Sequence, residues 1–167
     1  MLAQNAPFVA PQELHDLAFR YGLAVDSRDA SMLGSVFTRD GIIRGHGQAD
    51  ARYAGKTGWK TMIAEVSASF GQTMHNVYNQ TFELAPDGAV SGLTTGVASH
   101  ILLADAGAKE LSLLDFAMRY HNRYALEDGV WKFAERALEV VWVENRPVRR
   151  FSANMLGDEL RGFAAVD

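Results

Sequence analysis

The sequence contains no cysteine, and this absence removes several classes of function. Without cysteine the chain cannot form a disulfide scaffold, a thiolate nucleophile, a cysteine-ligated zinc site or an iron–sulfur cluster. It also lacks an apolar run long enough to span a membrane, and residues 1–5 carry no basic segment ahead of an apolar stretch. We therefore expect a soluble, cytoplasmic protein.

An excess of positive charge is missing as well. Sixteen Lys and Arg residues stand against 20 Asp and Glu residues, which gives a formal net charge of −4. This balance provides no electrostatic reason to bind nucleic acid or an anionic membrane. We expect neither as a partner.

The sequence motifs of several enzyme classes are absent. The chain has no G-x-S-x-G elbow, no phosphate-binding glycine-rich loop, no G-x-G-x-x-G and no H-E-x-x-H. Its five histidines (15, 46, 75, 100 and 121) are scattered, and none is paired at metal-ligand spacing. What remains is acid–base chemistry by His, Asp, Tyr and Arg, for which we expect no metal and no cofactor.

The length of 167 residues predicts one compact domain with a sizeable core. We expect a loose arm over residues 1–10, a single domain over 11–144 and a tail over 145–167. The tail carries a small basic run (Arg146, Arg149 and Arg150) and then apolar residues that must cover something: Phe151, Met155, Leu156, Leu160 and Phe163. The surface that they cover is either the mouth of a pocket or a neighbouring subunit.

Apolar residues at helical spacing predict three helices. The first begins at Pro11 and buries a face that includes Leu14 and Tyr21, the second is capped by Asp29, and the third runs through residues 59–70. Turn-forming triplets at 39–41, 86–88 and 127–129 and a polar loop over 47–58 separate the other elements. The expected strands are residues 42–44, 73–84, 90–104, 113–126 and 130–144.

Antiparallel strands that follow helices predict an α+β domain, with the helices on one face of a curved sheet and a pocket between them. Gly92 and Gly96 lie inside a predicted strand, where they either permit a bend or leave room for a ligand. The pattern predicts the place of a site but not its activity.

Asp26 ends the first predicted helix, and His75 begins the first long strand. Taken singly, each has an ordinary structural interpretation, as a helix-end carboxylate and as a hydrogen-bonded core histidine. Together, residues 21–29 (YGLAVDSRD), the triplet Met74-His75-Asn76 and the segment 124–133 with E-D-G-V-W-K-F resemble the SnoaL-like proteins. These belong to the nuclear-transport-factor-like (cystatin-like) superfamily. More narrowly, these segments resemble the branch with scytalone dehydratase, hexachlorocyclohexane dehydrochlorinase and bile-acid dehydratase.

The resemblance covers roughly residues 11–144 and implies a cystatin-like cone. In such a cone, three N-terminal helices pack on a strongly curved, mostly antiparallel sheet that encloses a pocket. Asp26 and His75 occupy the positions at which this branch has a catalytic Asp–His dyad. A buried carboxylate that accepts one imidazole N–H fixes the tautomer and raises the basicity of the other nitrogen. The branch also suggests a homotrimer, with a dimer as the alternative.

Strand alternation suggests further pocket residues. If His75 points inward, Asn79 follows it, and Ala98 and His100 share a face on the next strand. His100 is either a second proton donor or a hydrogen-bonding partner of the ligand. In the third strand either Met118, Tyr120 and Asn122 or the pair Arg119 and His121 faces the cavity. The full set that we expect to bind substrate is Tyr21, Ile43, Tyr53, Asn79, Ala98, His100, Tyr120, Arg136, Leu138, Val140 and Trp142.

Three of these positions leave alternatives open. Arg136 falls where the dehydrochlorinase has an arginine that steadies the leaving anion, but an ion pair with Glu135, Glu139 or Asp26 is equally consistent with the sequence. Either Ile43 or the residues Arg44 and His46 face the pocket. Tyr21 stands where the dehydrochlorinase has a lysine, so a phenol replaces an ammonium there, and Tyr53 is a further candidate acid.

The resemblance implies a cofactor-independent lyase of aromatic compound catabolism. Asp26 orients His75, which abstracts a proton from a hydrophobic, aromatic or polycyclic substrate. Elimination of water follows, or retro-aldol loss of a small aldehyde such as formaldehyde. The alternatives are a non-catalytic small subunit of a ring-hydroxylating dioxygenase, and an isomerase or polyketide cyclase on the same fold.

Overall fold

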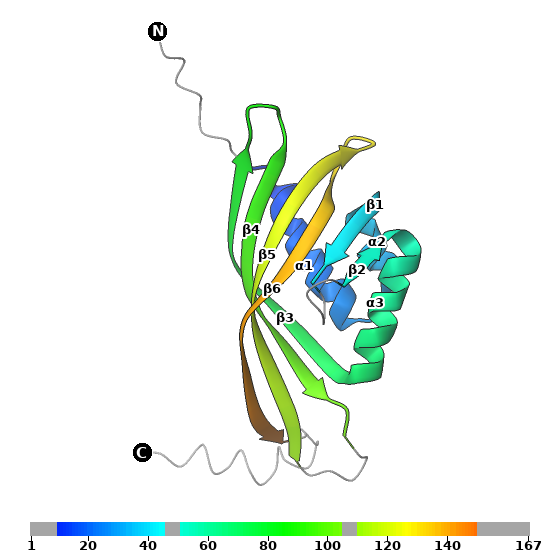
Figure 1. Ribbon diagram of the computed structural model, residues 1–167, viewed down its shortest axis with the longest axis vertical. Helices are drawn as coiled ribbons and strands as arrows, with labels where there is room; N and C mark the ends of the chain where they lie inside the picture. Colours follow the sequence, from blue (N-terminus) through cyan, green and yellow to red (C-terminus); the bar gives the residue numbers. More distant parts are fainter. Residues whose placement is uncertain (1–9, 46–50, 105–109, 150–167) are drawn as a thin grey trace.

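The computed structural model describes residues 10–45, 51–104 and 110–149. Two helices come first, α1 (Gln12–Asp26) and α2 (Ala30–Ser35), followed by the strands β1 (Phe37–Arg44) and β2 (Arg52–Ala54). Helix α3 (Gly55–Ser69) then leads into four long strands: β3 (Phe70–Leu84), β4 (Val90–Leu102), β5 (Glu110–Glu127) and β6 (Val130–Arg149). Figure 1 shows the strongly bent β3–β6 ribbons, with β5 and β6 continuing beyond the helices.

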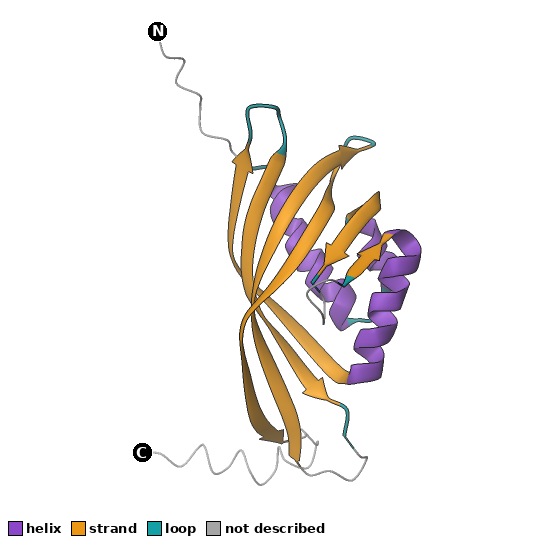
Figure 2. Ribbon diagram, in the orientation of Figure 1, coloured by secondary structure: helices purple, strands orange, loops and turns teal. Residues whose placement is uncertain are grey.

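The six described strands form one mixed sheet in the order β2-β1-β6-β5-β4-β3. Only β1 and β6 run parallel, and the other neighbouring pairs are antiparallel. The helices cover one face of this sheet (Figure 2). The predicted α+β cone, with helices on a curved and mostly antiparallel sheet, is therefore confirmed.

The helices hold the sheet through the apolar faces that the spacing predicts. Helix α1 buries Leu14, Leu17, Ala18, Tyr21, Ala24 and Val25, and α3 buries Trp59, Met62, Ile63 and Val66. The Asp29 side chain accepts hydrogen bonds from the backbone N–H groups of Ser31 and Met32, so the predicted cap of α2 is present. Since α1 packs mainly on β3, Asp26 at the end of the helix lies beside the first residues of that strand.

Gly96 and Gly92 mark a close approach of β4 to β3. A Cβ atom at Gly96 would lie 2.3 Å from the backbone oxygen of Asn76, and one at Gly92 would lie 2.3 Å from the oxygen of Thr81. Both distances are far below van der Waals contact. Of the two predicted roles, room for a ligand is wrong at these positions, because the space beside each glycine is filled by the backbone of the neighbouring strand.

Several predicted boundaries are wrong. Residues 39–41 do not form a turn, because β1 begins at Phe37 and takes up this triplet in a register shift between Phe37 and Ile42. The predicted loop over 47–58 contains β2 and the start of α3, and Phe70 opens β3 instead of ending the helix. Pro11 precedes α1 as its N-cap.

Strand β6 continues to Arg149, so the first residues of the predicted tail belong to the sheet. The rest of the tail, residues 150–167, and residues 1–9 of the predicted arm lie outside the described residues. None of the helices in the described ranges is long and apolar enough to cross a membrane.

Candidate active site

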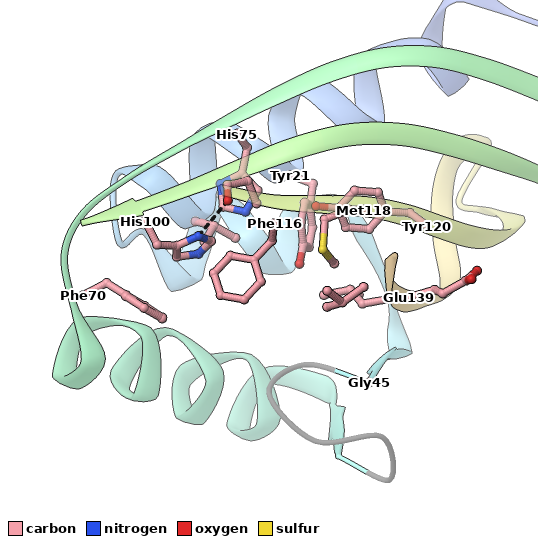
Figure 3. A pocket seen from close by; sticks show the side chains of 13 residues that line it. Tyr21, Gly45, Phe70, His75, His100, Phe116, Met118, Tyr120 and Glu139 are labelled. Carbon is pink, nitrogen blue, oxygen red and sulfur yellow. Dashed lines mark hydrogen bonds between the residues drawn. The ribbon is translucent and has the colours of Figure 1, made fainter. Parts of the chain in front are cut away.

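A cavity of about 490 Å³ lies between α1, the start of β3 and the concave face of the sheet. Its walls are mostly apolar, with His75 and His100 toward one end and Glu139 toward the other (Figure 3). The lining residues are Tyr21, Val25, Gly45, Phe70, His75, Ala98, His100, Phe116, Met118, Tyr120, Leu138, Glu139 and Val140. A mostly apolar cavity with few polar groups is typical of a small-molecule site.

Asp26 and His75 meet at the wall of this cavity. The Nδ1 atom of His75 lies 2.7 Å from Oδ1 of Asp26, and the backbone N–H of His75 donates to Oδ2 at 2.9 Å. The Thr73 hydroxyl donates to Oδ1 at 2.8 Å. An ionised carboxylate only accepts, so Nδ1 carries the proton and Nε2 is left as the nitrogen available to a ligand.

Local sequence explains why these two residues meet. Asp26 is the last residue of α1, and His75 lies on β3, which packs against that helix. Gly22 lies one helical turn before Asp26, and a Cβ atom there would lie 3.0 Å from the Cβ of His75. The absence of a side chain at Gly22 lets the histidine lie against the helix.

The surroundings of Asp26 favour its ionised form. Burial alone would raise the pKa of Asp26, but the hydrogen bonds from His75 and Thr73 and the charge of protonated His75 outweigh burial. The pKa of this carboxyl therefore lies below its ordinary value. A carboxylate that stays ionised holds the imidazole in one orientation at neutral pH.

A second histidine lies next to the first. The ring centroids of His75 and His100 are 5.6 Å apart, and Nδ1 of His100 is 3.0 Å from the carbonyl oxygen of Ala98. Because a carbonyl oxygen accepts, this contact places a proton on Nδ1 of His100. Phe70 and Phe116 pack around the His100 ring at 4.5 and 5.1 Å (Figure 3).

Two tyrosines and a buried arginine lie beside the histidines. The Arg136 guanidinium lies 4.5 Å from the ring centroid of Tyr21 and 3.9 Å from that of Tyr120, and it donates to Asn122 Oδ1 at 2.7 Å. The guanidinium does not line the cavity but lies against the two rings. Neither an ion pair with a carboxylate nor direct exposure to the ligand, as the sequence suggested, is found for Arg136 within the described residues.

Burial dominates the electrostatics of this cluster. It raises the pKa of Tyr21 and of Tyr120, although the Arg136 charge offsets part of the effect, and it raises that of Tyr124 to about 12. Burial also lowers the pKa of Arg136, against the attraction of the surrounding phenols. At neutral pH the tyrosines are therefore neutral and can donate hydrogen bonds.

The remaining predicted binding residues divide into two groups. The first group lines the cavity and consists of Tyr21, Ala98, His100, Tyr120, Leu138 and Val140. Of the two faces of β5 that the sequence left open, the one with Met118, Tyr120 and Asn122 points inward, and Arg119 and His121 point out. Ile43, Tyr53, Asn79, Arg136 and Trp142 do not line the cavity.

Each of these five has a local reason for lying elsewhere. Ile43 is fully buried in the core, which turns Arg44 outward to an ion pair with Glu135 at 2.9 Å. The Tyr53 hydroxyl bonds Glu65, and burial together with that partner raises the pKa of Tyr53 to about 12.

The alternation that would carry Asn79 inward is broken by a register shift between Val77 and Gln80. A second shift, between Ala117 and Met118, leaves Trp142 paired with Ala117 on the outward row, and its side chain is 65% exposed. Arg136 is covered by the tyrosines, and His46 lies outside the described residues.

The sequence interpretation missed several cavity residues. Val25, Gly45, Phe70, Phe116 and Glu139 line the cavity but were not among the predicted binding residues. Phe116 had a usable signal, because it precedes Met118 at period two on the same strand. No group of three or more His, Asp or Glu side chains in the described ranges is arranged to hold a metal ion.

Solved structures with this fold resemble the chain over most of its length. The type 2 hexachlorocyclohexane dehydrochlorinase LinA aligns with a TM-score of 0.71 and 22% identity, over 84% of this chain and 91% of LinA. LinA type 3 from Novosphingobium barchaimii gives 0.71 and 20%, over 84% and 92%. A protein from Novosphingobium aromaticivorans, provisionally assigned as a scytalone dehydratase, gives 0.67 and 17%, over 83% and 88%. At such identities the likeness shows the fold.

Sequence comparison supplies the family. No curated protein matches the chain. The SnoaL-like domain matches residues 10–137, which includes the helices, the first long strands and both Asp26 and His75. The family predicted from the sequence motifs is thereby confirmed, and the chain belongs to the SnoaL-like domain family.

Proposed function

We propose that the protein is a cofactor-independent lyase in which His75 is the base and Asp26 orients it. The observation that carries this proposal is the 2.7 Å contact between Nδ1 of His75 and Asp26 at the wall of an apolar cavity. A neutral imidazole with one nitrogen committed to a carboxylate presents the other as a proton acceptor. The names of the similar structures, a dehydrochlorinase and a dehydratase, are consistent with elimination.

In the proposed reaction, Nε2 of His75 takes a proton from a carbon atom next to the carbon that bears the leaving group. The C–H electron pair forms the new double bond, and the leaving hydroxyl takes a proton and departs as water. Tyr21 and the protonated form of His100 are the candidate proton donors, since both residues line the cavity near His75. His100 donates from Nε2 as an imidazolium, because its Nδ1 proton is held by the Ala98 carbonyl. If His75 deprotonates a hydroxyl instead, the hydroxyl oxygen forms the C=O bond of a small aldehyde such as formaldehyde. The C–C bond breaks, and its electron pair stays on the other fragment, which then takes a proton.

The lining supports a hydrophobic, aromatic or polycyclic substrate. Phe70, Phe116, Met118, Leu138 and Val140 present apolar or aromatic surface to the cavity. Arg136 adds a positive charge behind Tyr21 and Tyr120. This placement strengthens the two phenols as donors to a group on which negative charge develops.

We also propose that the protein is a homotrimer. Trp142 and the neighbouring Val141 of β6 are large apolar side chains with exposed fractions of 65% and 38%, and exposed apolar surface of this kind suits a subunit contact. The number three comes from the family resemblance.

The reaction is tested by mass spectrometry of the purified protein incubated with aromatic β-hydroxy compounds and 1,3-diols. Loss of water identifies a dehydratase, and loss of formaldehyde identifies the aldehyde-releasing lyase. Products of unchanged mass but altered retention would contradict a lyase and favour an isomerase or cyclase. The His75→Ala protein is the control for every product.

A further inference from the structure

Beyond the Asp–His pair, a chain of hydrogen bonds leads away from the cavity to the end of α1. Nη1 of Arg28 donates to the Thr73 hydroxyl at 2.7 Å, and that hydroxyl donates to Oδ1 of Asp26 at 2.8 Å. A guanidinium has no acceptor atom, so the hydroxyl can only accept from Arg28 and must send its single proton to Asp26. The direction of each bond in the chain is thereby fixed.

Arg28 is held firmly in this role. Its backbone has a φ of +59°, a left-handed conformation that residues with side chains seldom adopt. The same guanidinium also donates to the carbonyl of Val25 at 2.7 Å and to that of Phe70 at 3.3 Å. Arg28 thus ties the last turn of α1 to the start of β3, the two elements that carry Asp26 and His75. Strained backbone persists only where such surroundings hold it.

We propose that Thr73 and Arg28 are positioning residues for the Asp26–His75 pair. Arg28 fixes the direction of the Thr73 hydroxyl, and the hydroxyl fixes the carboxylate of Asp26 against the imidazole. The hydroxyl also stands between two opposite charges, because within the described residues Arg28 contacts Asp26 only through Thr73.

This arrangement has a consequence for the tautomer of His75. Without the Thr73 hydroxyl, Oδ1 of Asp26 keeps only its bond to the His75 ring. Nη1 of Arg28 then keeps the Val25 carbonyl but loses its other acceptor, and it can turn toward the carboxylate. A direct ion pair with Arg28 would compete with the imidazole for Asp26, and the proton on Nδ1 would lose its acceptor. The pair would then present a mixture of tautomers to the cavity.

The test measures the ring ¹⁵N chemical shifts of His75 by NMR, with no substrate present. Thr73→Val removes the hydroxyl at nearly constant volume, and Thr73→Ser keeps it. We expect Thr73→Val to move both ring nitrogens toward the values of a tautomer mixture, and Thr73→Ser to restore the wild-type shifts. Thr81→Val, an exposed change on the same strand, is the matched control and should leave the shifts unchanged.

Arg28→Gly tests the other half of the proposal, because glycine accepts the left-handed backbone while the guanidinium is lost. We expect a shift of the His75 signals in the same direction as in Thr73→Val. Wild-type ¹⁵N shifts in a folded Thr73→Val protein would overturn the proposal, and wild-type shifts in Arg28→Gly would overturn the part assigned to Arg28.

The effect on turnover rests on the function proposed above. Thr73→Val removes a hydrogen bond to a charged group, and the loss of such a bond is expected to lower kcat by about tenfold to a hundredfold. Thr73→Ser should recover the wild-type kcat. The two readouts separate the hypotheses. If Thr73→Val alters the ¹⁵N shifts but the wild-type protein converts no substrate, the positioning network is supported and the lyase proposal is not. If Thr73→Val alters the shifts and keeps the wild-type kcat, the positioning role in catalysis is overturned.

Discussion

At the scale of single residues, the site depends on a carboxylate that stays ionised. Asp26 accepts three hydrogen bonds, from the Thr73 hydroxyl and from the ring and backbone of His75. These contacts hold the pKa of Asp26 below its ordinary value in spite of burial. Its ionised form is therefore linked to the stability of the fold as well as to the orientation of the base.

This linkage predicts how stability depends on pH. The folded-state pKa of Asp26 is lowered, so its contribution is present above the unfolded-state pKa of about 4 and is lost as the pH falls through the folded value. The free energy of unfolding should fall more steeply below about pH 4 in the wild type than in Asp26→Asn. Denaturant titrations of both proteins at several pH values measure this free energy of unfolding.

The comparison between wild type and variant isolates Asp26, since the pKa values of Asp115, Glu127 and Glu139 are also lowered and contribute equally to both proteins. Parallel pH profiles for the two proteins would contradict the linkage.

The sequence predicted which residues carry the chemistry better than it predicted their neighbours. Asp26 and His75 could be paired from the motifs around them, and burial of Tyr21 from helical spacing. The partners of Arg136 could not be predicted, because the aromatic rings that cover it come from α1 and β5. Asn79 was misplaced by a register shift that leaves no mark in the local sequence.

At the scale of elements, the curved sheet depends on close strand contacts. Apolar periodicity was enough to predict the three helices and the long strands, because each buries one face. The turn-like triplet 39–41 was wrongly predicted to be a turn. It lies within β1, at a register shift between Phe37 and Ile42. Glycine is needed at position 41 because a Cβ atom there would lie 2.8 Å from the Cβ of Phe37. Composition alone does not separate such a shift from a turn.

Gly96 offers a test at this scale. Its substitution by alanine places a Cβ atom 2.3 Å from the Asn76 backbone oxygen, which only a movement of β3 can relieve. We expect Gly96→Ala to lower the free energy of unfolding by about 2 kcal/mol or more. Gly71→Ala is the matched control, because its new Cβ would make only ordinary contacts, the nearest at 3.8 Å. Equal stabilities of the two variants, measured by chemical denaturation, would contradict this account.

At the scale of the whole molecule, the described residues leave apolar side chains exposed on the part of the sheet that extends beyond the helices. Trp142 is 65% exposed there, next to Val140, Val141 and Val143. The sequence predicted an oligomer from the family resemblance, but it assigned Trp142 to the cavity wall. The outward row occupied by Trp142 suits a subunit contact better than substrate binding.

Light scattering on the purified protein tests this surface. We expect a mass near three times the 18.3 kDa of one chain for the wild type, and a lower mass for Trp142→Glu. Leu126→Glu changes a side chain that is 57% exposed at the opposite end of the sheet, and it should leave the mass unchanged. A monomeric wild type would contradict the proposed trimer.

The central claim, that His75 is the base and Asp26 orients it, is tested most directly by the rate of product formation in three folded proteins. With a substrate identified by mass spectrometry, His75→Ala should form no product above background. Asp26→Asn should keep the fold and lose about a hundredfold or more in kcat, because an amide cannot hold the imidazole as a carboxylate does. Full activity in a folded His75→Ala protein would contradict the account.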